Sequence, residues 1–379
     1  MYTICVISPG YPTKTHPFFP FVKMIVDEFC KQGNNIYVIA PQSLLKCLFR
    51  GVERHPFLSS YFYGDTGVTV YQPFYISLGN RLDVINQFFL KKVVKKVLKK
   101  LPVKPDVIYS HFWQSGFTGY EYALSHKVPI FVASGESSIS FRADSLTKTN
   151  YCQYISGLIC VSTKNKDESI QLGLTDGRNS IVIPNAIDST IFYKKDKNEL
   201  RSRYGIDKDA FIVCFVGWFN ERKGAYRVSK AIDRLNNKNI NSFFIGAGLD
   251  NELIEPECKG ILFKGYLPHD IVPDYLNMSD VFVLPTLREG CCNAVVEAMA
   301  CGLPIISSDL PFNWDVLNQT NSVLIDPYNI DEIADAINSF YEDSSKRALL
   351  SKGALSTAKD LTIEERSRKI LKFIINTKH

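Results

Sequence analysis

Short apolar runs that alternate with helical segments constrain the fold of this 379-residue chain more than any other feature. A strand predicted at residues 3–8 is followed by a loop, a helix from about Phe18, and a second strand at 35–40. Parallel strands need a crossover of this kind, and strands covered on both faces read as continuous apolar runs. We therefore predict an α/β fold with a parallel sheet. Its further strands are predicted at residues 106–111, 129–134 and 157–162.

The same alternation starts again in the second half of the chain. Residues 211–217 read as a strand, 218–224 as a loop and 225–235 as a helix, and "SFFIGAG", "ILFKGY" and "DVFVLPT" read as later strands. Because 379 residues exceed one comfortable core, two domains are expected. The order of elements predicts two Rossmann-like, doubly wound domains that face each other across a cleft. Their predicted extents are 1–188 and 189–361.

The last helix is a candidate to cross back to the first domain. Residues 362–377, "TIEERSRKILKFIINT", begin with a Thr-x-x-Glu capping box and continue with apolar residues at helical spacing. Periodicity predicts the helix, at about 362–379, but does not identify what it packs against.

Positive charge is concentrated in the first half of the chain. Residues 1–190 hold 20 Lys and Arg against 13 Asp and Glu, a net charge of +7, and the remainder holds 24 against 26, a net charge of −2. Much of the excess lies in one predicted helix, whose lysines are Lys91, Lys92, Lys95, Lys96, Lys99 and Lys100. One interpretation is the solvated face of a helix packed on the core. The other is attachment to an anionic membrane surface or acceptor.

From its composition and its first residues we expect neither a secreted nor a membrane-spanning protein. The N-terminal "MYTICVISPGYP" lacks the basic and apolar regions of a signal peptide, and no run of about 18 apolar residues is present. The ten cysteines are scattered without metal-ligand spacing, which favours reduced, structural thiols in a cytosolic protein. We expect a cytoplasmic protein, a candidate for peripheral attachment to the inner face of the plasma membrane, with no nucleic-acid partner.

The stretch "REGCCNAVVEAMACGLPII" carries two acids, Glu289 and Glu297, with seven residues between them. Glu289 is predicted in the loop after a strand, where parallel sheets bind ligands. Asn293 is the predicted N-cap of the following helix, whose first amides can hold a phosphate. Glu297 then lies about one turn into that helix, where a carboxylate can accept two hydrogen bonds from a ribose diol. The alternative is that both acids only favour the helix dipole.

This stretch resembles the E-x7-E signature of the retaining GT-B glycosyltransferases, the group 1 or family 4 enzymes that use nucleotide sugars. Other segments resemble that family in the same order: "SPGYPTKTHPFF", "VSTKNKDESIQLGL", "IVIPNAIDSTIF", "FVGWFNERKGAYRVSKAI", "FKGYLPHDIVPDYLNMSDVFVLPT" and "SDLPFNWDVL". Each piece is short, but the ordered set covers nearly the whole chain. The resemblance implies a GT-B fold, with the acceptor side in the first domain and the donor side in the second.

The resemblance also implies roles for the residues of the motif. Glu297 would bind the donor ribose, and Glu289 would orient the transferred sugar beside the reaction centre. Gly290, Cys292 and Asn293 would contact the sugar and the phosphates.

Four residues outside the motif receive roles from the same resemblance. Lys223, with Arg222 before it, would neutralise the departing diphosphate. His111 matches a histidine that contacts the donor sugar, although a strand-end histidine is often only a packed residue. Gly10 would let the first loop approach the phosphates. Two departures are visible: Trp218 stands where relatives usually carry arginine, and the first loop has one glycine where relatives often have two.

Together these features predict a retaining glycosyltransferase. It would move a sugar from a UDP- or GDP-type donor to a glycan or lipid-linked acceptor in surface polysaccharide assembly. No Asp-x-Asp motif sits in a suitable loop, so we expect a metal-independent reaction without a cofactor. Three alternatives stay open: a hydride-transfer Rossmann enzyme, a non-catalytic sugar-binding or scaffold protein, and a sugar-nucleotide epimerase.

Overall fold

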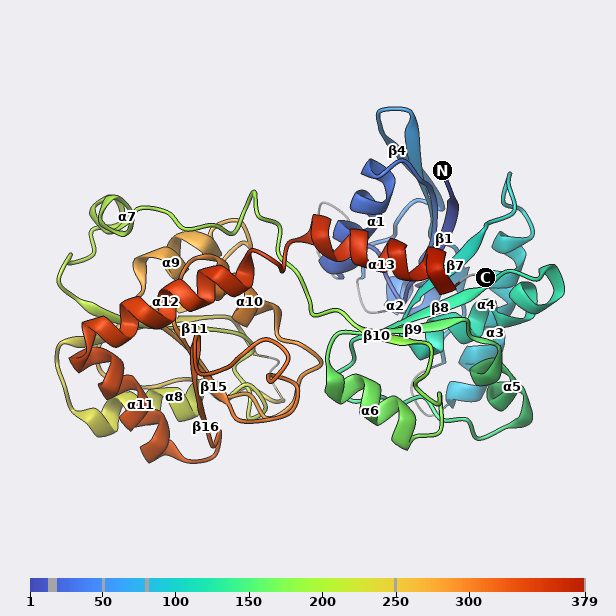
Figure 1. The fold of residues 1–379 in the computed structure, drawn as a ribbon. Helices are drawn as coiled ribbons and strands as arrows, with labels where there is room; N and C mark the ends of the chain where they lie inside the picture. Colours follow the sequence, from blue (N-terminus) through green and yellow to red (C-terminus); the bar gives the residue numbers. More distant parts are fainter. Residues whose placement is uncertain (13–18, 50–51, 79–81, 249–250, 378–379) are drawn as a thin grey trace. The chain divides into compact units, whose positions relative to one another are not determined.

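The computed structural model describes residues 1–12, 19–49, 52–78, 82–248 and 251–377. The chain divides into two compact units (Figure 1). Unit 1 comprises Met1–Ile183 together with Arg366–His379, and unit 2 comprises Pro184–Glu365.

Unit 1 is built on a mostly parallel sheet with the strand order β10-β9-β8-β7-β1-β2-β5-β4 in its described part. The edge strand β4 runs antiparallel to β5, whereas the other pairs among the described strands of this sheet are parallel, and a separate short pair joins β3 to β6. The strands are β1 Thr3–Ile7, β2 Asn35–Ile39, β3 Gln42–Ser43, β4 Leu58–Tyr63, β5 Thr66–Tyr71, β6 Phe74–Tyr75, β7 Val107–His111, β8 Ile130–Ser134, β9 Gly157–Cys160 and β10 Ser180–Val182. The helices are α1 Pro20–Lys31, α2 Leu44–Phe49, α3 Asp83–Leu98, α4 Trp113–His126, α5 Leu146–Tyr154, α6 Thr163–Gln171 and the C-terminal α13 Ile363–Thr377, most of which belongs to this unit.

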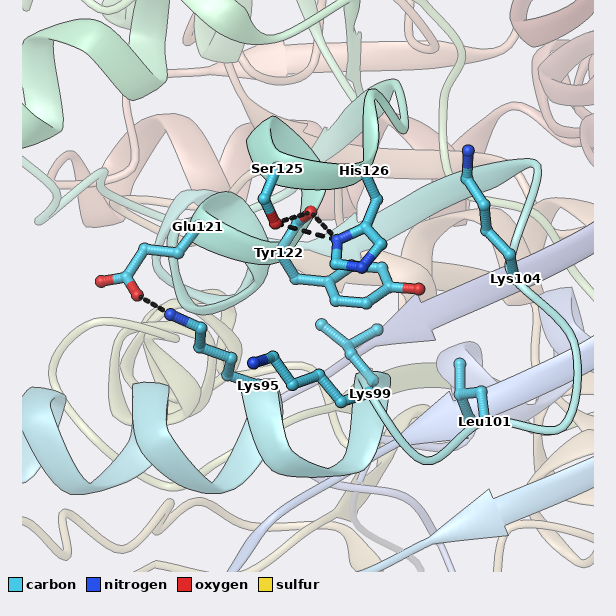
Figure 2. A pocket seen from close by; sticks show the side chains of 9 residues that line it. Lys95, Lys99, Leu101, Lys104, Glu121, Tyr122, Ser125 and His126 are labelled. Atoms are coloured by element: carbon cyan, nitrogen blue, oxygen red, sulfur yellow. Dashed lines mark hydrogen bonds and ion pairs between the residues drawn. The ribbon is translucent and has the colours of Figure 1, made fainter.

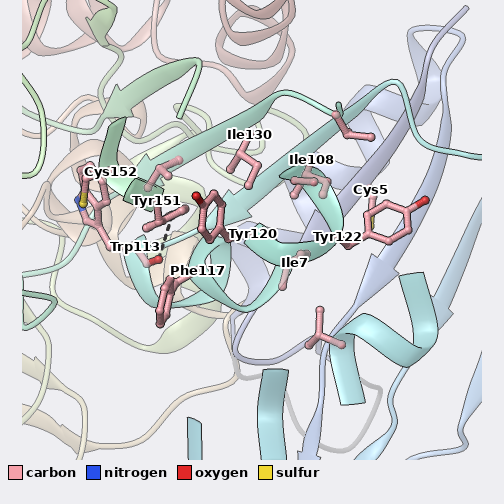
Figure 3. Packing of buried hydrophobic residues seen from close by; sticks show 14 of the residues in the cluster. Cys5, Ile7, Ile108, Trp113, Phe117, Tyr120, Tyr122, Ile130, Tyr151 and Cys152 are labelled. Atoms are coloured by element: carbon pink, nitrogen blue, oxygen red, sulfur yellow. Dashed lines mark hydrogen bonds between the residues drawn. The ribbon is translucent and has the colours of Figure 1, made fainter. Parts of the chain in front are cut away.

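The core of unit 1 lies where α4 packs on the central strands. Trp113, Phe117 and Tyr120 of α4 face Tyr151 of α5, and apolar residues of β1, β7 and β8 line the other side (Figure 3). The Tyr151 hydroxyl donates a hydrogen bond of 3.1 Å to the Trp113 carbonyl, so the one polar atom of this ring is satisfied. This packing fixes the start of α4 directly after β7.

The C-terminal helix α13 lies in unit 1, beside its strands (Figure 1). The rings of Phe373 and Phe131 of β8 meet edge to face with centroids 5.9 Å apart. The Gln32 side chain, at the end of α1, donates a hydrogen bond to the Ser367 hydroxyl.

Unit 2 is a parallel sheet with the order β13-β12-β11-β14-β15-β16 among its described residues. Counted from its own first strand this is 3-2-1-4-5-6, the order of the doubly wound dinucleotide-binding fold. The strands are β11 Phe211–Val216, β12 Ile240–Ile245, β13 Ile261–Gly265, β14 Val281–Leu284, β15 Ile305–Ser308 and β16 Ser322–Ile325. The helices are α7 Lys197–Tyr204, α8 Ala225–Leu235, α9 Val272–Met278, α10 Asn293–Ala300, α11 Ile330–Glu342 and α12 Ser344–Ala358.

The predicted α/β fold with two Rossmann-like sheets is confirmed. The predicted strands and helices lie within two residues of the observed ones, except that the strand predicted as "SFFIGAG" extends three residues beyond the end of β12 at Ile245. The start of the first helix was predicted near Phe18, which lies outside the described residues; α1 is described from Pro20. One local prediction was wrong. Cys292, not Asn293, is the N-cap of α10, and Asn293 is its first helical residue.

Candidate functional site

Two loops meet at the carboxyl edge of the unit 2 sheet, between β11 and β14. The strand order reverses at this point, which is where open α/β sheets bind ligands. One loop runs from β11 to α8 and the other from β14 to α10. The Leu287 amide donates to the Arg222 carbonyl at 2.8 Å, so the two loops are hydrogen-bonded together.

Close approach of the backbone also fixes the first loop. Gly246, after β12, has φ +154°, and a Cβ there would lie 1.8 Å from the carbonyl oxygen of Gly217. Only glycine allows both this conformation and this contact. The "GAG" of the hydride-transfer alternative therefore serves here to pack one loop against another.

The centre of the unit 2 site is an ion cluster around Glu289. Its Oε1 accepts a hydrogen bond from Arg222 Nη1 at 2.6 Å, lies 2.8 Å from Lys223 Nζ, and accepts another from Thr286 Oγ1 at 2.9 Å. Lys223 is only 9% exposed. Burial acts to lower the pKa of its ammonium group, but the Cys292 sulfur and the Glu289 carboxylate more than offset this, so the pKa is raised. Lys223 is therefore a buried cation at neutral pH.

The N-terminus of α10 opens beside this cluster. Its N-cap, Cys292, has its sulfur 3.8 Å from Lys223 Nζ and makes no side-chain capping hydrogen bond. The Asn293 side chain is held by Asn185, whose Nδ2 donates to Asn293 Oδ1 at 2.7 Å and to the Cys291 carbonyl at 2.9 Å. Lys223 and the amides at the start of α10 thus place positive charge on the same side of the sheet.

Glu297 lies in the middle of α10 and is mostly buried. Its Oε1 is 3.1 Å from His269 Nε2, in the loop between β13 and α9. The His269 ring packs on Phe192 with centroids 5.0 Å apart. The hydrogen bond to Glu297 raises the pKa of His269 above its ordinary value, against the effect of burial. Glu297 is therefore oriented by a partner on a neighbouring loop.

In unit 1, His111 occupies the end of β7, next to β1. Its side chain is 6% exposed, and its Nε2 has no hydrogen-bond partner among the described residues. Burial, with a smaller contribution from Arg366, lowers the pKa of His111 to about 3, so the ring is neutral at physiological pH. A neutral imidazole can bond an uncharged hydroxyl, but it cannot neutralise a phosphate.

The residue after His111 has a strained backbone. Phe112 has φ 75° and ψ 155°, a region that non-glycine residues rarely occupy. The Glu136 carboxylate supports the neighbouring loop: it accepts hydrogen bonds from Ser134 Oγ at 2.8 Å and from the Gly135 amide at 2.9 Å. Burial raises the pKa of Glu136.

Gly10 lies in the loop after β1, the strand that pairs with β7. A Cβ on Gly10 would come within 2.7 Å of the Phe19 ring. Phe19 meets Phe21, and Phe21 meets His111, with ring centroids 5.8 and 5.7 Å apart. Gly10 and His111 are therefore linked through two aromatic rings within unit 1. The predicted first loop includes residues 13–18, which lie outside the described residues.

Comparison with known proteins decides the family. Residues 196–356 match the family described as Glycosyl transferases group 1. The chain is 27% identical over 360 residues to TuaC of Bacillus subtilis (strain 168), a glycosyltransferase whose name assigns it to teichuronic acid biosynthesis, and the match covers 88% of each chain. The chain is a group 1 glycosyltransferase.

Other relatives agree with this assignment. The Escherichia coli UDP-Gal:alpha-D-GlcNAc-diphosphoundecaprenol alpha-1,3-galactosyltransferase is 29% identical over 266 residues, covering 64% of this chain and 67% of that one. Among solved structures, a sucrose-phosphate synthase of Thermosynechococcus elongatus superposes with a TM-score of 0.78 at 14% identity, covering 99% of each chain. Anabaena HepE, solved in complex with UDP, gives 0.73 at 17% identity, covering 99% of this chain and all of that one. These structures show the shared GT-B fold.

For this group 1 glycosyltransferase the structure brings together Arg222, Lys223, Glu289 and Cys292, with Gly290 in the same loop. Asn293 and Glu297 follow on α10. His111 and Gly10 are linked within unit 1 through the rings of Phe19 and Phe21. Trp218, the departure from the family pattern, is 45% exposed at the start of the β11–α8 loop. Family membership removes the hydride-transfer alternative.

Three contacting residues of the glycosyltransferase were missed by sequence reasoning. They are Asn185, which holds Asn293; Thr286, which bonds Glu289; and His269, which bonds Glu297. Each lies in or beside a segment that carries the family resemblance. The sequence therefore indicated only that each polar side chain lies in or beside a segment that resembles the family. It did not indicate which residue that side chain contacts.

Within the described residues, no helix has the length and apolar character needed to cross a membrane. The same residues contain no group of three or more His, Cys, Asp and Glu side chains arranged to hold a metal ion.

Proposed function

We propose that this glycosyltransferase, which uses a nucleotide sugar, is a retaining enzyme that takes its sugar from a UDP-type donor, with a GDP-type donor as the second choice. The relative from Escherichia coli is named for UDP-Gal, and Anabaena HepE was solved with UDP. The acceptor we propose is a lipid-linked or growing glycan of a surface polysaccharide. TuaC is named for teichuronic acid biosynthesis, and the Escherichia coli enzyme is named for an acceptor sugar on diphosphoundecaprenol. Unit 2 would bind the donor and unit 1 the acceptor.

The ion cluster at the β11/β14 switch point carries the proposal. Cleavage of the sugar–phosphate bond builds negative charge on the departing nucleoside diphosphate. A buried, charged Lys223, with Arg222 beside it and the first amides of α10 nearby, stabilises that charge as it develops. Within this proposal, Glu297 receives the ribose diol, and Gly290, Cys292 and Asn293 contact the sugar and the phosphates.

The proposed chemistry leaves the configuration at the anomeric carbon unchanged. The acceptor hydroxyl attacks from the face on which the diphosphate leaves, the new glycosidic bond forms as the sugar–phosphate bond breaks, and a phosphate oxygen of the leaving group takes the hydroxyl proton. His111 would hold the donor sugar through its neutral ring, Glu289 would orient the sugar, and Gly10 would allow the first loop to approach the phosphates. No metal ion takes part in this scheme.

We further propose that the enzyme works at the inner face of the plasma membrane, where a lipid-linked acceptor is presented. The six lysines at positions 91–100 would contribute contacts to anionic lipid.

Lys223→Ala, with Lys230→Ala as a matched control, tests the donor site. Lys230 lies in α8, a few residues further along the chain, with its ammonium group 5.0 Å from the Tyr226 ring centroid. Thermal-shift titration with UDP, GDP, ADP and CMP identifies the base, and hydrolysis of the matching UDP- or GDP-sugar reports turnover. We expect Lys223→Ala to lose roughly 100-fold in turnover, which is typical when a hydrogen-bond donor that stabilises transition-state charge is removed. Lys230→Ala should retain normal rates. Normal turnover by Lys223→Ala would refute the proposed site.

A further inference from the structure

The solvent-facing side of α3 changes character along its length. Val84 is 84% exposed, Phe88 is 53% exposed and Ile85 is 41% exposed, while the second half of the same side carries exposed lysines. The opposite side packs on the core through Val94, Val97 and Leu98. The exposed set recurs at helical spacing, so it forms one continuous line. We call this line the α3 stripe; its members are Val84, Ile85, Phe88, Lys92, Lys96 and Lys99.

Not all the lysines of this helix face solvent freely. Lys95 Nζ is 2.7 Å from Oε2 of Glu121 on α4, as Figure 2 shows. Lys91 Nζ is 3.9 Å from the other Glu121 oxygen and 3.8 Å from the centroid of the Phe117 ring. Burial lowers the pKa of Lys91. These two lysines attach α3 to α4. Lys92, Lys96 and Lys99 are exposed and define the charged part of the stripe, although Lys92 Nζ lies 4.2 Å from the Phe88 ring centroid and Lys99 also lines a pocket with Lys95.

More apolar surface lies next to the apolar end of the stripe. The Leu78 amide donates a hydrogen bond of 2.7 Å to Asn86 Oδ1, which ties the segment after β6 to α3. Ile76 and Leu78 in this segment, and Leu82 at the N-cap of α3, are all 40% exposed or more. A soluble surface rarely exposes so many large apolar side chains together without using them for binding.

The net charge of residues 44–100 indicates which kind of partner fits the α3 stripe. Residues 44–100 contain ten Lys and Arg and three Asp and Glu, a net charge of +7, which equals the whole excess of residues 1–190. From residue 84 to residue 100 there is no acidic residue. An apolar end followed by lysines on one helix face complements a bilayer, in which acyl chains lie beneath anionic headgroups.

We propose that α3 inserts its apolar end, Val84, Ile85 and Phe88, into an anionic phospholipid bilayer while Lys92, Lys96 and Lys99 bind the headgroups. This inference rests on the membrane contact proposed above. It adds that apolar side chains insert into the bilayer, in addition to the attraction between lysines and anionic headgroups. Salt screens the lysine contacts but leaves the burial of apolar side chains in place. Part of the binding therefore persists at high salt.

Vesicle co-sedimentation of the full chain, with phosphatidylcholine vesicles and with vesicles containing phosphatidylglycerol, tests the proposal. Val84→Asp/Phe88→Asp should weaken binding to anionic vesicles by about tenfold or more and remove the salt-resistant part. Lys92→Ser/Lys96→Ser/Lys99→Ser should lower the affinity for anionic vesicles by up to about fivefold for each lysine replaced. The salt-resistant part of the binding should remain. The controls are Leu146→Asp and Leu349→Asp, which alter exposed leucines elsewhere, and a triple serine variant of Lys208, Lys238 and Lys352. The control variants should bind as the wild type does.

Val84→Trp gives a direct signal of insertion. Its fluorescence, compared with that of the wild-type protein, should shift to the blue on addition of anionic vesicles. Unshifted emission, or wild-type vesicle binding by Val84→Asp/Phe88→Asp, would overturn the proposal. A dimer in light scattering that Val84→Asp/Phe88→Asp converts to a monomer, without any vesicle binding, would assign the surface to a second copy instead. All these measurements omit the donor, so they succeed or fail separately from turnover of the nucleotide sugar.

Discussion

The ammonium group of Lys223 lies 2.8 Å from Oε1 of Glu289, the same oxygen that Arg222 bonds at 2.6 Å. One carboxylate therefore holds two neighbouring cations in fixed positions and cancels one of their two charges. Such a cluster is organised before charge develops on a leaving group, which is the condition for effective electrostatic stabilisation. It also means that Glu289 opposes anion binding while it positions the groups that perform it.

Glu289→Gln should separate these two effects. Removing the negative charge frees both cations, so UDP should bind about threefold to tenfold more tightly, which is ~1 kcal/mol. The folded state should lose about 2 kcal/mol, because a largely buried ion pair is broken while Arg222 stays partly in water. Turnover should fall despite tighter UDP binding. Isothermal titration with UDP and steady-state kinetics measure these quantities.

Thr286→Val is the matched control, since it removes a hydrogen bond to the same oxygen without changing the charge. UDP affinity should stay close to that of the wild type. Weaker UDP binding by Glu289→Gln would show that the carboxylate contributes to diphosphate binding in another way.

The bond between His269 and Glu297 predicts a pH-dependent contribution to stability. The pKa of His269 is raised in the folded protein, so its contribution is fully present below the unfolded pKa of about 6.5 and is lost as pH rises through the folded pKa. His269 is more than half exposed, and solvent screening limits the effect to a few tenths of a kcal/mol.

Calorimetric Tm values at pH 6 and pH 9, for the wild type, His269→Gln, Glu297→Gln and the double variant, test this contribution. The coupling between the two residues should be favourable at pH 6 and smaller at pH 9. A coupling that is equal at both pH values would show that the positive charge of His269 does not stabilise the pair.

The sequence predicts the strands that position this site, but it does not predict the contacts between its loops. The strands were predictable because they are buried on both faces and read as apolar runs, and the position of Lys223 and Glu289 after two such strands placed both at one edge of the sheet. The contact itself depends on loop conformations that no periodicity encodes. The same holds for His269, whose partner Glu297 lies on another element. The β4–β5 hairpin was missed because β4 is an edge strand whose residues are all exposed or only partly buried.

His111 should make the protein sensitive to acid. Its pKa is lowered to about 3, below the unfolded value, so its contribution to stability is present above about pH 6.5 and is lost as pH falls towards the folded pKa. The loss is about 1.4 kcal/mol for each pH unit in that window. Chemical denaturation between pH 7 and pH 5 should show this slope in the wild type and a shallower one in His111→Asn. Equal slopes would mean that other groups dominate.

Gly246→Ala should test whether the contact between the loops after β11 and β12 holds the unit 2 site together. The backbone conformation at Gly246 is one that side chains rarely adopt, and an added Cβ would lie 1.8 Å from the carbonyl oxygen of Gly217, which is backbone and cannot rotate away. We expect a loss of about 3 kcal/mol or more in the free energy of unfolding, together with weaker UDP binding. Gly173→Ala is the control, since Gly173 also has a positive φ but faces open space, and it should cost only about 1 kcal/mol. If denaturant titration gave the two variants the same stability, the contact between Gly246 and Gly217 would not constrain the β11–α8 loop that carries Lys223.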